Sequence, residues 1–207
     1  MFKRNTKRKT GKFSSQKMGR LIKWESYLER DLIYLLEFET EVLKYIEQPF
    51  KITVKINGKV HWYRPDFLVQ KKECIEIIEV KPTWYLNEPE SLQQRAIGEA
   101  FCSDKDIIFK VVTEKEIQEG NFLKNVKILF RYSRTKVSLK HSHKIFQVIK
   151  DTNPLTIEEL SQRITVSGKE EMECVIYNLI FKKHLFVDLT QPLSKKTLIL
   201  GGIWQDG

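Results

Sequence analysis

The sequence has only three cysteines and no apolar run near the roughly eighteen residues that a membrane-spanning helix needs. Cys74, Cys102 and Cys174 are odd in number and far apart, and no two of them form a C-x-x-C pair. This spacing fits reduced, buried thiols better than a disulfide or zinc framework. The N-terminus also lacks the apolar core of a signal peptide. We therefore expect a cytoplasmic protein with no membrane partner.

Acidic residues are absent before Glu25, whereas nine of the 36 basic residues lie in that segment. The other 27 basic residues are balanced by 27 acidic ones, so the net charge of +9 is carried by residues 1–24. We expect this segment to be a flexible basic arm that binds DNA phosphates, with a solubilising tail or localisation signal as the alternative. The DNA-binding candidates in it are Lys3, Arg4, Lys7, Arg8, Lys9, Lys12, Lys17 and Arg20.

The most specific pattern is an aspartate followed thirteen residues later by Glu79-Val80-Lys81, at the end of an apolar run. Asp66 and Glu79 supply the oxygen ligands that a hard divalent cation prefers, and the ammonium of Lys81 can orient an attacking water. This spacing suggests a metal-dependent nuclease. Arg64, just before Asp66, is a further candidate for neutralising phosphate charge.

Strand alternation bears on this interpretation. In an extended strand Ile75, Ile77, Glu79 and Lys81 share one face, and the run is apolar on both faces, as expected of a strand buried on two sides. Charged side chains at the end of such a strand cost free energy unless they are paired or bind a metal ion. The alternative is a solvated strand end with a Glu/Lys pair, because short motifs of this kind often arise by chance.

The segment after the basic residues predicts a helix over residues 26–38. Ser26 and Glu29 have the spacing of a capping box, and the leucines recur on one helical face. That stripe consists of Leu28, Leu32, Leu35 and Leu36.

Two apolar runs, residues 50–56 and 59–63, flank Asn57-Gly58, which is a strong hairpin signal. A strand near Asp66, a helix near residues 92–102 and a strand over residues 107–112 follow. This order predicts an α/β fold with a central mixed sheet flanked by helices.

The second half of the chain predicts helices over residues 143–150, 157–164 and 169–183, followed by two short strands. Thr156 and Glu159 form another capping box. This is the pattern of a small winged-helix-like domain, and we place the domains at 25–137 and 138–207. The third helix begins with an acidic segment, so docking to a protein is favoured slightly over reading of DNA bases. His141 and His143 have no third ligand and are interpreted as a linker pair.

Residues 24–82 resemble the TnsA family, the endonuclease subunit of heteromeric cut-and-paste transposases. The resemblance includes Ser26-Tyr27-Leu28-Glu29, Leu35–Glu39, Val42 and Glu47-Gln48-Pro49 as well as the metal motif. It implies a restriction-endonuclease-like PD-(D/E)xK core. It also implies that Glu29 is a metal ligand, although the capping box gives this carboxylate a competing structural role.

The resemblance implies a magnesium site, in which manganese would substitute, formed by Glu29, Asp66, Glu79 and the carbonyl of Val80, with Lys81 as a further catalytic residue. Some family members carry another residue at the position of Glu79. Less favoured acidic residues are Glu99, for a second metal, and the group Glu37, Glu39 and Glu41 near the first helix.

The activity implied is cleavage of the non-transferred 5′ strand of double-stranded DNA at transposon ends. The implied partners are an integrase-like transposase subunit of the TnsB type and an ATP-dependent regulator of the TnsC type, and the implied location is the prokaryotic nucleoid. The alternatives are a stand-alone nuclease of restriction or junction-resolving type and a non-catalytic DNA-binding adaptor.

Overall fold

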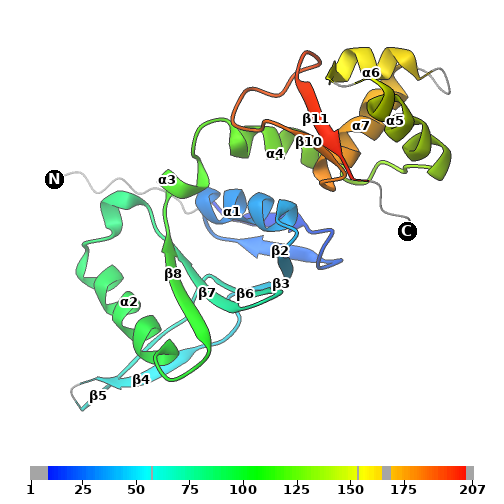
Figure 1. Cartoon of the computed structure of the whole chain (residues 1–207). Coiled ribbons are helices and arrows are strands. Elements are labelled where there is room, and N and C mark those ends of the chain that lie inside the picture. Colours follow the sequence, from blue (N-terminus) through cyan, green and yellow to red (C-terminus); the bar gives the residue numbers. More distant parts are fainter. Residues whose placement is uncertain (1–8, 57, 153, 165–168, 204–207) are drawn as a thin grey trace. The chain divides into compact units, whose positions relative to one another are not determined.

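The computed structural model describes residues 9–56, 58–152, 154–164 and 169–203 (Figure 1). The candidates Lys3, Arg4, Lys7 and Arg8 and the expected turn residue Asn57 lie outside the described residues. The chain divides into two compact units, residues 1–119 and 120–207, rather than at the boundary between 137 and 138 that we expected. No helix among the described residues is long and apolar enough to cross a bilayer.

The described part of the basic segment is folded, which differs from the flexible arm that we expected. β1 (Gly11–Ser14) and β2 (Leu21–Trp24) form an antiparallel hairpin. Phe13 and Ile22 face each other across it and are buried, with 6% and 0% of their surfaces exposed. Burial of this pair gives the hairpin an apolar side that stabilises it despite its charge.

Hydrogen bonds also hold this hairpin in place. The buried carboxylate of Glu37 accepts hydrogen bonds from Ser15 Oγ at 2.5 Å and from the Gln16 amide at 3.0 Å. The Lys17 ammonium donates to two backbone carbonyls at the end of the following helix. Arg20 forms a two-pronged contact with Glu47 at 2.7 and 2.6 Å. Lys17 and Arg20 therefore bind groups of the protein itself.

The helix predicted over residues 26–38 is confirmed as α1 (Tyr27–Phe38), with Ser26 as its N-cap. Ser26 Oγ accepts a hydrogen bond from the Glu29 amide at 3.1 Å. Leu32 and Leu36 of the predicted stripe are buried, together with Ile33. The leucine spacing thus identified the face that packs on the core.

The central sheet has four strands in the order β3-β6-β7-β8. β3 (Val42–Glu47), β6 (Phe67–Lys71) and β7 (Ile75–Val80) pair antiparallel, and β8 (Ile107–Val112) pairs parallel with β7. The central mixed sheet that the sequence predicted is therefore confirmed. The parallel step from β7 to β8 is made through the helix that connects them, as a crossover requires.

α1 and the connecting helix α2 (Pro89–Cys102) cover opposite faces of this sheet. Phe67 packs against Tyr45, whose hydroxyl donates to Glu37 of α1 at 2.6 Å. Leu68, which follows Phe67 in β6, faces the opposite side of the sheet and packs in a cluster that contains Ile97 of α2. Successive side chains of β6 thus fill two separate layers, and the sheet lies between the helices.

A separate two-stranded ribbon is formed by β4 (Ile52–Ile56) and β5 (Lys59–Tyr63), as the hairpin signal predicted. It extends beyond the four-stranded sheet beside α2 (Figure 1). Two short elements, η1 (Thr83–Tyr85) after β7 and α3 (Glu114–Ile117) after β8, complete the first unit.

The second unit contains the three expected helices, α5 (Leu139–Asp151), α6 (Ile157–Arg163) and α7 (Lys169–Phe181), and the Thr156/Glu159 capping box is formed. β10 (Leu185–Val187) and β11 (Leu198–Gly202) follow, and the short strand β9 (Leu155–Thr156) joins their sheet. An additional helix, α4 (Phe122–Phe130), packs against α7 and places residues 122–130 in this unit. The side chains of residues 169–171, in the acidic start of the third helix, lie outside the described residues.

Candidate active site

The antiparallel pairing of β6 with β7 brings the two motif carboxylates together. Phe67 lies opposite Ile78, so Asp66, the residue before β6, lies at the end of β7. The amide of Val80 donates a hydrogen bond to Oδ2 of Asp66 at 2.7 Å. Residues thirteen positions apart in the sequence therefore meet because a short turn reverses the chain between the two strands.

Glu79 and Lys81 form an ion pair in a largely enclosed place. Lys81 Nζ lies 2.7 Å from Glu79 Oε1, and the side chains of Lys81 and Glu79 are only 17% and 4% exposed, respectively. Glu79 Oε2 is buried and has no hydrogen-bond partner among the described residues. A buried carboxylate oxygen without a partner is costly, so this atom is a position where a cation or a proton donor would be stabilising.

These residues line a pocket of about 660 Å³ in the first unit. Glu29 and Tyr27 enter it from α1, and Trp84 and Tyr85 from η1. Two basic residues predicted to contact DNA, Lys9 and Arg64, also line it. One pocket thus contains the predicted catalytic and metal-binding residues together with these two basic residues: Glu29, Asp66, Glu79, Val80, Lys81, Lys9 and Arg64.

Burial, together with crowding of negative charge, raises the pKa values of the carboxyl groups. Burial, and then the charges of Glu79 and Glu29, raise the pKa of Asp66 well above its usual value. Burial also raises the pKa of Glu79, although the Lys81 ammonium opposes this increase. The pKa of Glu29 is raised chiefly by burial. The protein therefore assembles three carboxyl groups whose ionised forms are destabilised without added positive charge.

The position of Glu29 bears on the two roles that the sequence left open for it, metal ligand and helix cap. It lines the pocket, yet its Oε2 accepts a hydrogen bond from the Glu25 amide at 2.8 Å, one residue before the N-cap. Within residues 9–56, 58–152, 154–164 and 169–203, no three side chains of His, Cys, Asp or Glu converge as they do around a metal ion. One oxygen of Glu29 is thus engaged at the helix terminus, while its charge still acts on Asp66 and Glu79 in the same pocket.

The other acidic candidates lie elsewhere. Glu37 is buried against the N-terminal hairpin, Glu41 pairs with Lys72 at 3.0 Å, and Glu99 pairs with Arg95 at 2.7 Å. None of these three, nor Glu39, lines the pocket. His141 lies at the start of α5, in the other unit, where its amide donates to Ser138 Oγ. Glu41 and Glu99 are exposed surface charges, as the sequence favoured. Glu37 is instead buried, and His141 and His143 belong to α5 rather than to a linker, because the helix begins at Leu139.

Several pocket residues were not singled out from the sequence. Gln94 of α2 lines the pocket, and its buried Oε1 has no hydrogen-bond partner among the described residues. Trp84 is 75% exposed at the rim. Gln48 has a φ of 44°, in the left-handed region that non-glycine residues rarely adopt, and its amide donates to the Asp66 carbonyl at 2.8 Å. Only the folded arrangement identifies Gln94 and Trp84, because they belong to no motif, whereas Gln48 lies in the Glu47-Gln48-Pro49 segment of the resemblance.

The mixed sheet between two helices, with acidic groups and a lysine at one end of its central strands, fits an endonuclease-like fold. Residues 39–114 match the family model described as TnsA-like endonuclease N terminal. The match supports a TnsA-like family assignment and confirms the resemblance for this region. It spans β3 to β8 and includes Asp66, Glu79 and Lys81, whereas α1 with Glu29 precedes it. Comparison with curated proteins finds no match.

Proposed function

We propose that the protein is the metal-dependent DNA endonuclease subunit of a heteromeric transposase and cuts the 5′, non-transferred strand at transposon ends. The TnsA-like match indicates a nuclease related to transposition. The observation that carries the proposal is the buried, unpartnered Oε2 of Glu79 beside Asp66 and Lys81 in one pocket of the described residues. Magnesium is the proposed cofactor, and manganese is expected to substitute for it.

The donor set fits such a cation in its chemistry. Carboxylate oxygens are the ligands that hard divalent ions prefer. A positive charge would also offset the burial and the repulsion that together raise the pKa of Asp66. Asp66, Glu79 and the Val80 carbonyl are the proposed ligands. Glu29 is proposed to join them through its other carboxylate oxygen, because the Glu25 amide engages only Oε2. A bound cation supplies Lewis-acid stabilisation of the phosphate and a lower pKa for its coordinated water.

The protein groups position the reactants around that site. The proposed role of the Lys81 ammonium, which pairs with Glu79 at 2.7 Å, is to orient the attacking water and to stabilise negative charge on the phosphate. Lys9 and Arg64 supply positive charge at the pocket lining for the DNA backbone. The contacts proposed for this pocket are with the cation and the DNA backbone, so choice of site is assigned to the partners.

The test is a nicking assay on duplex DNA carrying a transposon end, with Mg²⁺, in the presence and absence of the integrase-like transposase subunit. Asp66→Ala and Lys81→Ala are each expected to reduce cleavage at least about 100-fold, which corresponds to the loss of roughly 3 kcal/mol of transition-state stabilisation. Asp104→Ala is the control, because Asp104 is an exposed carboxylate paired with Lys105 outside the pocket.

Wild-type cleavage by both Asp66→Ala and Lys81→Ala would show that the proposed site is wrong. Site-specific cleavage by the wild type without any transposase subunit would instead identify a stand-alone nuclease. DNA binding without cleavage under every condition would identify an adaptor.

For the second unit we propose docking to a partner protein, with the ATP-dependent regulator as the expected partner. Phe186 of β10 and Leu198 and Leu200 of β11 are exposed, by 38%, 49% and 61% of their surfaces. Apolar side chains gathered on one small sheet are typical of protein interfaces rather than of phosphate contacts. Leu200→Asp should abolish binding of the purified regulator and leave binding of DNA unchanged, whereas the reverse result would assign this unit to DNA.

A further inference from the structure

The outer face of the β4–β5 ribbon is unusual in composition. The pairing places Thr53 opposite Trp62 and Lys55 opposite Val60, so these four side chains share one face. All four are exposed, and Val60 and Trp62 have 69% and 60% of their surfaces open to solvent. The opposite face packs on α2 through the buried side chains of Ile52 and Tyr63. The ribbon therefore presents an outward surface that combines an aromatic ring, an aliphatic side chain and lysines.

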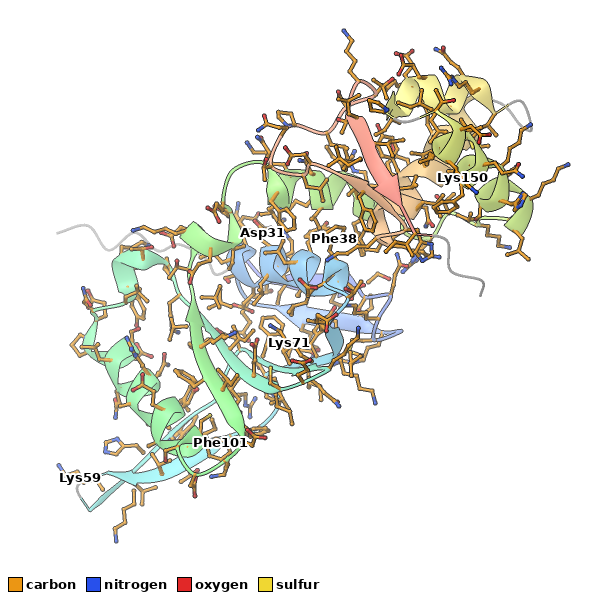
Figure 2. All side chains as sticks on the ribbon, in the orientation of Figure 1. Asp31, Phe38, Lys59, Lys71, Phe101 and Lys150 are labelled. Carbon is orange, nitrogen blue, oxygen red and sulfur yellow. The ribbon has the colours of Figure 1, made fainter. Side chains whose placement is uncertain are left out.

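The charge on this ribbon is of one sign. From Gln48 to Pro65 the chain has no Asp or Glu, whereas it carries Lys51, Lys55, Lys59 and Arg64. Lys51 Nζ lies 3.9 Å from the centre of the Trp62 ring, which holds this ammonium at the outer face. Lys59 lies at the tip of the ribbon (Figure 2). A basic surface with a fixed cation and an exposed ring complements a polyanion.

Contacts with α2 fix the ribbon in place. Gln93 Nε2 lies 2.5 Å from His61 Nδ1, and the rings of Phe50 and Phe101 are 5.8 Å apart. Figure 2 shows Phe101 on α2 beside the base of the ribbon. A ribbon anchored at both its base and its middle loses little conformational entropy when it binds a ligand.

The ribbon is also directly continuous with the candidate active site. Arg64 and the buried Pro65 alone separate the end of β5 from Asp66, and Arg64 lines the pocket. The five residues of β5 span about 17 Å at roughly 3.4 Å per residue. Each DNA strand carries one phosphate about every 3.4 Å along the helix axis, so the ribbon is as long as about five base pairs.

We infer that the outer face of the β4–β5 ribbon binds the phosphate backbone of duplex DNA next to the phosphodiester that is cut. This inference rests on the proposed function, because it takes the DNA in the pocket as given, and it adds a binding surface outside the pocket. Lys51 and Lys55 contact phosphates, while Trp62 and Val60 pack on sugars. A two-stranded ribbon has the width that a DNA groove accepts. The lack of carboxylates and the row of lysines favour this ligand over a protein partner.

The test measures DNA binding without cleavage. Binding of a duplex of about 30 base pairs is followed by fluorescence anisotropy for the full-length protein in EDTA, at several salt concentrations. Lys51→Ala/Lys55→Ala should weaken binding roughly tenfold and reduce the slope of log Kd against log salt by about 2, one unit for each phosphate that is no longer neutralised. Trp62→Ala should weaken binding with little change in slope.

The matched control is Lys44→Ala/Lys72→Ala. These lysines are exposed in the same unit, on β3 and after β6, so the control removes the same charge away from the ribbon. It should retain wild-type affinity. Because all the substituted residues are exposed, the melting temperatures should match that of the wild type, and hydroxyl-radical footprinting should show about five fewer protected base pairs beside the cut only in the ribbon variant.

Two results would overturn the inference while leaving the proposed function standing. One is that Lys51→Ala/Lys55→Ala binds DNA with wild-type affinity and salt slope, while cleavage still depends on Asp66. The other is an equal loss of affinity in the Lys44/Lys72 control. Conversely, weakened binding by the ribbon variant together with cleavage that is unaffected by Asp66→Ala would support the ribbon and reject the proposed site.

Discussion

The amide of Val80 donates a hydrogen bond to Oδ2 of Asp66 over 2.7 Å, between the neighbouring ends of two paired strands. This bond fixes one oxygen of Asp66 and places its carboxyl group beside that of Glu79. The fold therefore holds the two acidic groups together at a cost in free energy, since burial and then the charge of Glu79 disfavour the ionised form of Asp66. Stability and activity should consequently respond in opposite directions when this site is changed.

Asp66→Asn should raise the melting temperature at pH 8 by about 2–4 °C, the shift that roughly 1 kcal/mol produces in a chain of this size. An amide oxygen can still accept the Val80 hydrogen bond, but it carries no charge. Because the pKa of Asp66 is raised in the folded state, its stabilising effect is complete below the ordinary carboxyl pKa and is lost as pH rises through the raised value. The gain should therefore vanish at acidic pH.

The matched control for this stability measurement is Asp104→Asn. The Lys105 ammonium, through its hydrogen bond, lowers the pKa of Asp104, so removal of this charge should not stabilise the protein at pH 8. Calorimetry at pH 4, 6 and 8 distinguishes the two variants. Equal melting temperatures for the wild type and Asp66→Asn at pH 8 would contradict the prediction.

Cleavage should increase with pH above the usual range of carboxyl titration. The ligands must be ionised to hold a cation, and burial raises the pKa values of Asp66 and Glu79. A higher Mg²⁺ concentration should move the midpoint of the profile to lower pH, because metal binding and protonation compete for the same oxygens. Rates measured between pH 5 and 8 at two Mg²⁺ concentrations test this. A midpoint that does not depend on Mg²⁺ would argue against these ligands.

Glu37→Ala should lower the free energy of unfolding by about 3 kcal/mol or more. The carboxylate accepts hydrogen bonds from Ser15 Oγ, the Gln16 and Lys17 amides and the Tyr45 hydroxyl, and its loss leaves buried donors without partners. Urea unfolding measures the change, and faster tryptic cleavage at Lys12 would show that the N-terminal hairpin has loosened.

Glu41→Ala is the comparison for Glu37. Its carboxylate is about half exposed and pairs with Lys72, so its removal should cost no more than about 1 kcal/mol. Similar losses of stability in the two variants would mean that the hydrogen bonds to Glu37 do not hold the hairpin.

Gly98→Ala should destabilise the first unit by about 1–3 kcal/mol. A Cβ atom at Gly98 would lie 2.2 Å from the ring of Phe109, so the absence of a side chain lets α2 approach β8 closely. Phe109→Leu in the same chain should recover part of this loss. A double-mutant cycle checks the coupling, and strictly additive effects would show that the two residues do not compete for the same space.

The parts of the fold that the sequence predicted are those with short-range signals. Ser26 and the leucine spacing identified α1, Asn57-Gly58 identified the β4–β5 hairpin, and alternation placed Glu79 at the end of a buried strand. Each signal depends on residues within a few positions of one another. Asp66 and Glu79 lie side by side because a short turn joins their two strands.

The parts that were missed depend on distant contacts. The N-terminal hairpin was obscured by its basic residues, and it is held by Glu37, which is 22 positions from Ser15. The acceptor for Arg20 is Glu47, 27 positions away. Gln94 joins the pocket only because α2 crosses back over the sheet. Local composition carries no information on such partners, so the sequence suggested a flexible arm where the structure has a folded hairpin.

The segment that links the ribbon to the pocket, Arg64-Pro65, is conformationally restricted. Proline restricts the residue before it to extended backbone, so Arg64 has little freedom to bend, and Pro65 is itself buried against the unit. The covalent chain thus sets a constant distance from the lysines of the ribbon to the carboxyl group of Asp66. A nuclease with this geometry would act as a ruler, in which the position of the cut is measured from a bound phosphate rather than read from the bases.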